Sequence, residues 1–376
     1  MNQPGKILKN IPADSTYYMK KAFQLAEKAR GTCSPNPFVG AVIVKNGKVI
    51  SEGWTQPYGG DHAEIQALKK AGKSARDADL YVTLEPCVHY GKTPPCTDAI
   101  IKAGIKRVFI GIIDPNPLVN GKGVKKLMDA GIEVISGIME EAISRQLEYY
   151  LCRIQKGRPF VLWKTALSMD GKYAAKDGSS RWITGESSRR LVHHLREEAD
   201  VILSSIGTVL KDDPMLNVRL PKPIKQPLRA ILDPYLEIPL NSKIVQSLLE
   251  YRTTIFCARG KENSPHSELL ISLGASIYPI TAKGKILCLK EVLGILHQQG
   301  NYLILLECGS ELASSFFSEK LIDKSYIFYA PKILGGNKAI LSELDLPDLK
   351  SAINYKDISI QKKGEDWLII GYPSYS

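Results

Sequence analysis

The sequence predicts an α/β protein with two domains. At 376 residues the chain exceeds the size of one ordinary hydrophobic core. Short apolar runs typical of strands alternate with amphipathic runs typical of helices along both halves. A short polar break, Lys156-Gly157-Arg158-Pro159, separates these halves. We therefore expect one layered α/β domain over residues 1–155 and a second over residues 156–376.

A helix and a hairpin open the first half. Met19, Ala22, Phe23 and Ala26 recur at helical spacing, which predicts a helix from Ser15 to about residue 30, capped by the side chains at 14 and 15. Asn46-Gly47 is a strong signal for a tight turn and lies between apolar runs over 39–44 and 48–53. These runs therefore predict two antiparallel strands.

The rest of the first half alternates helix and strand, and Gly104 should end one of the helices. We expect helices over 62–72, 98–103, 123–130 and 140–153, and strands over 80–84, 108–112 and 132–136.

The second half shows the same alternation and no repeat of the first. The segment 220–227, rich in proline and lysine, should be an exposed loop. We expect strands over 160–166, 200–204, 228–232, 254–257, 276–280, 303–306 and 326–330, with a helix over 186–198 and another from residue 312.

Composition is typical of a globular protein that contacts no membrane. Hydrophobic residues make up 44% and charged residues 24%, and no apolar run is long enough to span a bilayer. The N-terminal stretch from Met1 to Ser15 has no apolar core of a secretory leader. Seven cysteines without regular spacing favour reduced thiols, so we expect a cytoplasmic protein.

The net charge of +11 raises the question of nucleic-acid binding. Residues 1–155 carry 21 Lys and Arg against 15 Asp and Glu, and the remainder carries 29 against 24, so the excess is even. A nucleic-acid enzyme would more often concentrate its charge in one stripe. An anionic small molecule such as a nucleotide needs only a few Arg and Lys per pocket, and a generally basic solvated surface explains the charge as well as either of these ligands does.

Metal-ligand residues appear in a fixed order in the first quarter of the chain. His62-Ala63-Glu64 is followed by Pro86-Cys87 and then by Cys96. One imidazole and two thiolates suit tetrahedral Zn²⁺ with a fourth position open to water. The order matches the zinc nucleobase deaminase signature, although eight residues rather than two separate the cysteines. The residues therefore predict hydrolytic deamination, with Glu64 moving protons.

The alternative for this motif is a closed zinc site that only stabilises loops. Such a site needs a fourth protein ligand, and His89 is the obvious candidate. A closed site would leave Glu64 without a role, so we favour this interpretation less. Two residues of a helix body that lie two apart point roughly 200° apart, so His62 and Glu64 can share a site only where a helix begins.

A glycine turn marks a candidate phosphate site in the second half. The strand ending at Glu307 is followed by Cys308-Gly309-Ser310 and a helix, an arrangement that presents free backbone N–H groups. No G-x-G-x-x-G is present, which argues against a Rossmann dinucleotide site. Gly335-Gly336 could be a second phosphate turn, but a simple loop is the default interpretation.

Several longer motifs carry a specific resemblance. Pro35-Asn36-Pro37, the run from Thr83 to Cys96 with its Gly-Lys-Thr-Pro-Pro insert, Asp114-Pro115-Asn116-Pro117, Lys164 to Gly171, Gly207 to Pro214 and Ala330-Pro331-Lys332 resemble the bifunctional riboflavin-biosynthesis deaminase/reductase family. The resemblance implies a cytidine-deaminase-like α/β/α domain followed by a dihydrofolate-reductase-like α/β domain. It further implies zinc and NADPH as cofactors, a phosphoribosyl pyrimidine as substrate, and a homo-oligomer.

The resemblance also implies roles for individual residues. Glu64 would be catalytic, and His62, Cys87 and Cys96 would bind zinc. NADPH would contact Leu167, Trp182, Thr208, Asp212, Gly309, Ser310, Glu311, Leu312, Ala313, Ser314 and Ser315, and the substrate would contact Asn36, Ser180, Arg196, Leu216, Arg219 and Glu307.

Each reductase residue also has a plainer interpretation. Trp182 could be core, Arg196 could be a solvated helix residue, and Thr208 could be a helix N-cap. Arg219 is better supported, because its neighbours Leu216 and Val218 look buried and would aim it at a pocket. The sequence departs from the family at Glu311, a negative charge near the expected phosphates, and at Leu167, where contact would be through the backbone.

Two other functions stay open. A nucleoside or tRNA deaminase would share the zinc site but would need neither the second domain nor the insert before Cys96. A non-catalytic zinc-stabilised scaffold would have a site closed by His89.

Overall fold

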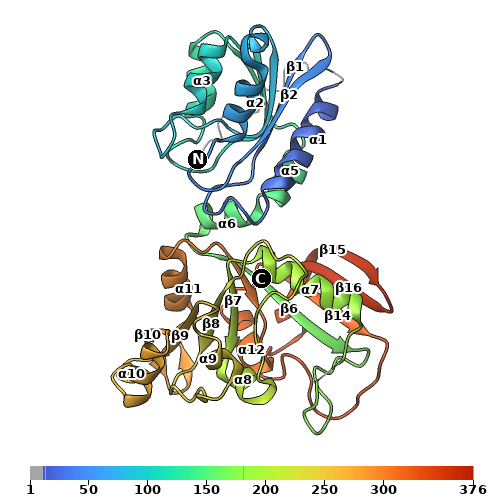
Figure 1. The fold of residues 1–376 in the computed structure, drawn as a ribbon. Coiled ribbons are helices and arrows are strands. Elements are labelled where there is room, and N and C mark those ends of the chain that lie inside the picture. Colours follow the sequence, from blue (N-terminus) through green and yellow to red (C-terminus); the bar gives the residue numbers. More distant parts are fainter. Residues whose placement is uncertain (1–11, 13, 181, 376) are drawn as a thin grey trace. The chain divides into compact units, whose positions relative to one another are not determined.

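A computed structural model (Figure 1) describes residues 12, 14–180 and 182–375. Its elements fall into two units, Met1–Gly157 and Arg158–Ser376, which we describe separately. Residues 1–11, on which most of the expectation about a secretory leader rests, lie outside the described residues. Within the described part of the chain, no helix has the length and apolar character needed to cross a membrane.

The first unit is built on a five-stranded sheet with the order β2-β1-β3-β4-β5. β1 pairs antiparallel with both β2 and β3, whereas β3, β4 and β5 run parallel. The predicted hairpin is confirmed, with Asn46 and Gly47 both at positive φ. The strands are β1 (Gly40–Lys45), β2 (Lys48–Trp54), β3 (Asp79–Leu84), β4 (Arg107–Ile112) and β5 (Glu133–Ser136).

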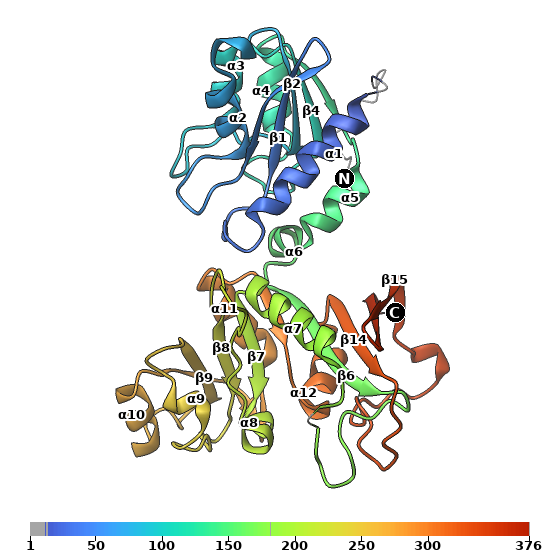
Figure 2. The ribbon, with the colours of Figure 1, turned by 45° about the vertical axis from the view of Figure 1, so that its right-hand side comes forward.

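Helices cover both faces of this sheet and give the expected α/β/α layers. In Figures 1 and 2, α1 and α5 lie on one side of the sheet and α2 and α3 on the other. The helices are α1 (Ser15–Ala26), α2 (Ala63–Ala71), α3 (Cys96–Ala103), α4 (Lys122–Asp129), α5 (Glu140–Gln146) and α6 (Glu148–Lys156), with 3-10 turns over Glu27–Ala29 and Gly72–Ala75.

Three helix details differ from the prediction. The side chain of Asp14 makes no capping hydrogen bond to α1. The helix expected over 140–153 is two helices, α5 and α6, because the backbone of Leu147 leaves the helical region at φ −96° and ψ 16°. α3 begins at Cys96, two residues before the expected start, and the expected stop at Gly104 is confirmed.

Two glycines allow helices to pack closely against the hairpin. A Cβ on Gly53 of β2 would come within 2.1 Å of the Ala63 carbonyl oxygen, at the first residue of α2. A Cβ on Gly40 of β1 would come within 1.9 Å of the Ala22 carbonyl oxygen in α1. The missing side chain at Gly53 therefore allows the first turn of α2 to lie directly against β2.

The second unit is built on a nine-stranded sheet with the order β10-β9-β8-β7-β13-β6-β14-β16-β15. The strands from β10 to β14 are parallel, and β16 and β15 add an antiparallel edge. The strands are β6 (Phe160–Ser168), β7 (Val201–Ser205), β8 (Leu228–Leu232), β9 (Thr253–Ala258), β10 (Ser276–Ile280), β13 (Leu303–Leu306), β14 (Lys324–Ala330), β15 (Asn354–Lys363) and β16 (Asp366–Ser374), with a separate pair, β11 (Ala282–Lys283) and β12 (Ile286–Leu287).

Helices pack on both faces of this sheet as well. Phe317 of α12 packs edge-on against Trp163 of β6, in a core that α11 shares. Val192 of α7 packs instead with Phe328 of β14 and Leu368 of β16. The helices are α7 (Glu186–Glu198), α8 (Ile206–Asp212), α9 (Lys243–Gln246), α10 (Pro265–Ser272), α11 (Leu289–Gln298) and α12 (Ser310–Ser318), with a 3-10 turn over Leu349–Ser351.

The packing at Gly53 can be tested by substitution. We expect Gly53→Ala to destabilise the first unit by about 1–3 kcal/mol, because the new Cβ would force the backbone of α2 away from β2. Gly91→Ala is the matched control, since a Cβ there meets nothing within 4 Å. Thermal unfolding of both variants measures the difference, and equal midpoints would contradict the argument.

Candidate functional sites

Three metal-ligand side chains meet where two helices of the first unit begin. His62 is the N-cap of α2, Cys96 is the first residue of α3, and Cys87 lies in the loop after β3. The His62 Nδ1 atom lies 3.2 Å from the Cys96 Sγ atom and 3.7 Å from the Cys87 Sγ atom. All three ligand atoms lie within 4.8 Å of one another. The structure thus brings together the three residues that the sequence predicts as ligands.

The donor set fits Zn²⁺. One ring nitrogen and two sulfurs are the ligands of a catalytic zinc site that keeps one position open. The backbone N–H of Cys96 donates to the Cys87 Sγ atom over 3.3 Å. Hydrogen bonds from the Cys96 thiol and the His62 ring lower the pKa of Cys87, whereas the hydrogen bond to Cys87 and burial raise the pKa of Cys96. The two sulfurs therefore share a proton, which zinc binding would displace.

His89 does not join this group. Among the described residues, the candidate metal-ligand cluster consists of His62, Cys87 and Cys96 alone. His89 lines the neighbouring cavity, and its Nδ1 atom is buried without a protein hydrogen-bond partner. The geometry therefore favours a three-ligand site over the closed site of a scaffold.

Glu64 stands beside the ligands without being one of them. It is the second residue of α2, is only 4% exposed, and lines the same cavity as His62 and Cys87. Burial raises its pKa, so its carboxyl group holds a proton more readily than an exposed one. A carboxyl group so placed can accept a proton and deliver it again.

The cavity beside these residues has a volume of about 340 Å³, within the usual range for small-molecule sites. Asn36, predicted as a substrate contact, lines it. Glu85 lines it too, and its carboxylate accepts backbone N–H groups of Asp114, Gly121 and Val124 over 3.0 to 3.2 Å. Glu85 was visible as part of a motif, but nothing in the sequence indicated that it holds the loop over 114–124.

Asp114 and Tyr150 form a second polar group on the wall. The Tyr150 hydroxyl reaches both carboxylate oxygens of Asp114, at 2.8 and 3.0 Å. Burial raises the pKa of Asp114 to about 6. Asp114 belongs to a motif that carries the family resemblance, whereas Tyr150 and Arg153, which also line the cavity, were not singled out in the sequence.

The second unit has a larger cavity, of about 510 Å³. It lies where β6, β7 and β13 approach their carboxyl ends, the usual position of ligands in open α/β sheets. The predicted residues that line it are Trp182, Thr208, Asp212, Gly309, Ser310, Glu311, Leu312, Ser180, Arg196, Leu216, Arg219 and Glu307.

Four predicted cofactor residues do not line this cavity. Leu167 is 2% exposed in β6, and Ala313 is fully buried in the core of the unit. Ser314 is also buried, and the hydroxyl of Ser315 donates to the backbone of its own helix at Glu311. Helix geometry explains the difference in α12, because only its first turn faces the cavity.

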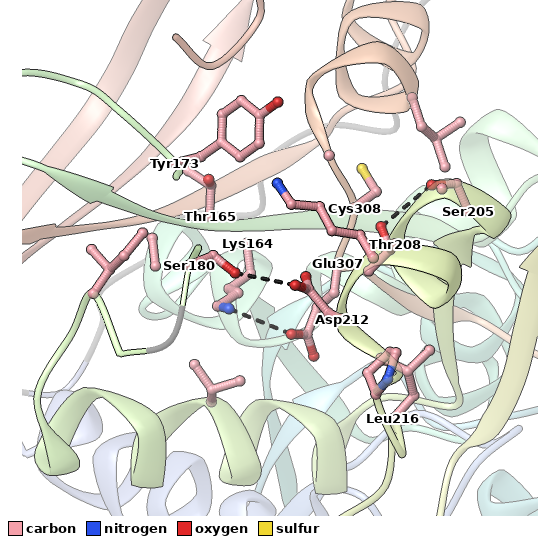
Figure 3. Close-up of a pocket in the computed structure, with 18 of the residues that line it drawn as sticks. Lys164, Thr165, Tyr173, Ser180, Ser205, Thr208, Asp212, Leu216, Glu307 and Cys308 are labelled. Carbon is pink, nitrogen blue, oxygen red and sulfur yellow. Dashed lines mark hydrogen bonds and ion pairs between the residues drawn. The ribbon is translucent and has the colours of Figure 1, made fainter. Parts of the chain in front are cut away.

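A buried charge cluster forms the floor of this cavity. Arg196 donates two hydrogen bonds to Glu307, at 2.6 and 3.1 Å, and Lys164 lies 3.4 Å from the same carboxylate. Figure 3 shows Lys164 and Glu307 facing each other, with Ser180 bonded to Asp212 beside them. Although burial opposes it, the two cations hold the pKa of Glu307 at about 2. Arg196 is thus not the solvated helix residue that its charged neighbours favoured.

Arg219 lines the cavity as its buried neighbours indicated, and Trp182 differs from its plainer interpretation. Leu216 and Val218 are buried as expected, and the Arg219 side chain donates to Asn217 over 2.9 Å at the cavity wall. The backbone N–H of Arg219 donates to His193, a cavity residue that the sequence did not single out. Trp182 is 63% exposed, with the Arg189 guanidinium over its ring, so it is not core.

The backbone N–H groups at the start of α12 are suited to bind a phosphate, but the side chains around them are not. Gly309 is the N-cap, and a Cβ there would meet nothing within 4 Å, so the first turn is open to a ligand. Glu343 accepts a short hydrogen bond from the Ser310 hydroxyl at this turn. Glu311 is paired with Lys285 over 2.6 Å. The cavity volume and the open helix start fit a nicotinamide nucleotide, while the Glu343 carboxylate, which accepts from the hydroxyls of Ser310 and Ser342, places a negative charge beside this turn.

Comparison with known proteins explains why both cavities occur on one chain. The sequence model of the RibD C-terminal domain matches residues 159–369. The model of the cytidine and deoxycytidylate deaminase zinc-binding region matches residues 12–112. The chain is also 43% identical over 358 residues to the riboflavin biosynthesis protein RibD of Aquifex aeolicus (strain VF5), covering 95% of this chain and 98% of that protein. The chain belongs to the RibD family.

Solved structures agree with this membership. RibD of Acinetobacter baumannii (form 1) is 36% identical with a TM-score of 0.86, covering 96% of this chain and 99% of that one. A diaminohydroxyphosphoribosylaminopyrimidine deaminase/5-amino-6-(5-phosphoribosylamino)uracil reductase from Thermotoga maritima gives 36% identity and a TM-score of 0.84 at the same coverage.

Family membership confirms the resemblance read from the motifs. The chain is a bifunctional enzyme, a zinc-dependent deaminase and a reductase of riboflavin biosynthesis. The expected fold of each domain is confirmed as well. The roles of individual side chains stay predictions, which the geometry above makes testable.

The charge cluster around Glu307 predicts a pH-dependent stability. Glu307→Gln should lower the free energy of unfolding of the second unit by about 3–5 kcal/mol at pH 7, because Arg196 and Lys164 would be buried without a counter-charge. Since the folded pKa of Glu307 is about 2 and the unfolded value is near 4.5, its stabilisation is complete above pH 4.5 and disappears as the pH falls toward 2.

Denaturant unfolding followed by tryptophan fluorescence at pH 7 and pH 3 measures this, since three of the four tryptophans lie in the second unit. Glu311→Gln, which breaks only the exposed pair with Lys285, should cost less than about 1 kcal/mol. A difference between wild type and Glu307→Gln that is the same at both pH values would refute the assignment.

Proposed function

We propose that this chain deaminates 2,5-diamino-6-ribosylamino-4(3H)-pyrimidinone 5′-phosphate in its first domain, residues 1–155. Its second domain, residues 156–376, then reduces the ribosyl group of the product to a ribityl chain with NADPH. The observation that carries the proposal is the three-ligand cluster of His62, Cys87 and Cys96 beside Glu64, on one chain with a RibD reductase domain.

In the deaminase cavity, His62, Cys87 and Cys96 would hold zinc, which supplies Lewis acidity that makes water a nucleophile at neutral pH. Glu64 takes a proton from the attacking water and delivers protons to the ring nitrogen and to the departing ammonia. Its burial supports this role, because a raised pKa suits a group that alternates between acid and base. Asn36 and Asp114 orient the pyrimidine.

In the reductase cavity, NADPH would supply a hydride to the ribose C1′ atom. Trp182, Thr208, Asp212 and the turn from Gly309 to Leu312 would hold the cofactor. The substrate would lie against Ser180, Arg196, Leu216, Arg219 and Glu307, with the guanidinium of Arg219 suited to its phosphate. The cavity lining does not include Leu167, Ala313, Ser314 or Ser315, so we propose no direct cofactor contact for them.

We infer from the sequence that the chain is cytoplasmic and binds neither nucleic acid nor membrane. A homo-oligomer is expected from the family resemblance alone. A nucleoside or tRNA deaminase is the second candidate function, because it would use the same ligand cluster.

Ammonia release and NADPH oxidation test the proposal directly. The zinc-loaded protein, supplied with the diaminopyrimidine ribosyl phosphate, should release ammonia without NADPH and should oxidise NADPH only after deamination. Glu64→Gln should keep one zinc per chain, lose about 10²- to 10⁴-fold in ammonia release, and reduce the already deaminated substrate at the wild-type rate. Deamination of cytidine or tRNA adenosine instead of this substrate would favour the second candidate.

The cofactor turn gives a separate prediction. We expect Glu343→Gln to bind NADPH about two- to five-fold more tightly, because it removes a negative charge beside the start of α12. Glu311→Gln should change affinity less, since Lys285 already pairs with Glu311. Titration of NADPH fluorescence measures both, without turnover. Weaker binding by Glu343→Gln would show that the cofactor phosphates lie elsewhere.

A further inference from the structure

The segment 213–219, between α8 and β8, forms one wall of the reductase cavity without belonging to a helix or a strand. Leu216, labelled in Figure 3, and Arg219 both line the cavity. The backbone of Leu216 lies in the left-handed region, at φ 47°. Because a bulky side chain is disfavoured there, the surrounding contacts must impose this conformation.

Side chains of neighbouring elements supply such contacts by bonding to the backbone of the segment. Before Leu216, the Met215 carbonyl oxygen accepts a hydrogen bond from Arg229 of β8 over 3.3 Å. After it, the Asn217 carbonyl oxygen accepts one from Arg196 of α7 over 3.0 Å. The strained residue is therefore held at the peptides on both of its sides.

Gln226 holds the next residue of the segment with both ends of its side-chain amide. Its Oε1 atom accepts the Val218 N–H over 2.8 Å, and its Nε2 atom donates to the Val218 carbonyl oxygen over 3.0 Å. In an antiparallel sheet, two paired residues exchange both of their backbone hydrogen bonds in the same way. The Gln226 amide thus replaces the neighbouring strand that this segment lacks, directly before Arg219.

Gln226 belongs to the segment 220–227, for which the sequence predicts no more than an exposed loop. Its side chain is exposed, and the described residues that line the cavity do not include it. The loop is nevertheless anchored beside it, because Lys225 pairs with Asp200 over 3.1 Å and β8 begins at Leu228. The amide therefore extends from a fixed backbone to the cavity wall.

We propose that Gln226 is a positioning residue of the reductase, which fixes the Val218 backbone and so directs the Arg219 side chain into the cavity. The assignment rests on the proposed function, in which Arg219 contacts the substrate, and extends it to a residue outside the cavity. Rotation of the Val218 peptide groups would displace the Arg219 guanidinium, and a misplacement of about 1 Å can lower activity about 100-fold.

Steady-state reduction of the already deaminated substrate tests this role. Gln226→Met should raise KM for that substrate about 5- to 20-fold and leave kcat and KM for NADPH within about two-fold, because only substrate binding is lost. Gln226→Glu keeps the side-chain size but places a carboxylate oxygen against the Val218 carbonyl oxygen, so it should raise KM at least as much. Ammonia release by the same samples should stay unchanged and serves as an internal reference.

Gln246→Met is the matched control. Gln246 is also exposed, and its side-chain amide donates a hydrogen bond to the Leu240 carbonyl oxygen over 2.9 Å, outside the cavity wall. This variant should lower the midpoint of thermal unfolding without changing KM for the substrate. A rise in KM as large as that of Gln226→Met would show that general destabilisation causes the effect, and would overturn the proposal.

A double variant tests whether Gln226 acts through Arg219. Arg219→Met should itself raise KM for the substrate. Adding Gln226→Met to it should raise KM by less than about two-fold more, because the contact that Gln226 directs is already absent. Two effects that multiply in full would overturn the proposal.

Residue-resolved hydrogen exchange separates this inference from the proposed function. Gln226→Met should speed exchange of the Val218 amide at least about ten-fold, since its acceptor is lost, whereas Gln246→Met should not. Unchanged exchange in Gln226→Met would overturn the inference whether or not the chain reduces the substrate. Failure of the proposed function would instead appear as a wild type that protects this amide but does not oxidise NADPH with the deaminated substrate.

Discussion

The deaminase site depends on α2 beginning between His62 and Glu64. Within a helix body these two side chains would point away from each other, since residues two apart are separated by about 200°. This constraint does not apply to His62, because His62 is the N-cap and has an extended backbone at φ −70° and ψ 161°. Glu64 lies in the first turn of the helix. The absence of a side chain at Gly53 lets this start pack closely against β2. A ligand and a proton carrier from one short motif can therefore face a single cavity.

In the reductase cavity the main electrostatic constraint is that buried charges must be paired. The floor of this cavity carries two cations and one carboxylate in nearly buried positions, and charges so placed persist only when they are paired. Glu307 neutralises only one of the two positive charges of Arg196 and Lys164, so the floor keeps a net positive charge. Arg219 adds a further positive charge to the lining of the same cavity.

Sequence reasoning succeeded where local patterns decide the outcome. The hairpin at Asn46-Gly47, the strand from Leu228 to Leu232 and the convergence of the three ligands follow from turn chemistry, apolar runs and helix starts. It missed β15 because nearly every side chain of that edge strand is exposed, so no apolar alternation marks it. It missed Tyr150 and Arg153 because their role depends on which loops lie opposite α6, more than 30 residues away along the chain.

The metal-ligand residues and the rest of the deaminase cavity are therefore specified by different features of the sequence. Residues 12–112 contain the chemical centre, in which a few spaced residues suffice to bring metal ligands together. The loop over 114–124 and α6 form another part of the cavity wall, held by contacts between residues far apart in the sequence. Glu85 shows why the two cannot be separated, because its buried carboxylate needs the N–H groups of Asp114, Gly121 and Val124. If the chain ended at residue 112, that carboxylate would be buried beside the metal ligands without these hydrogen-bond partners. A buried charge without partners destabilises the folded state.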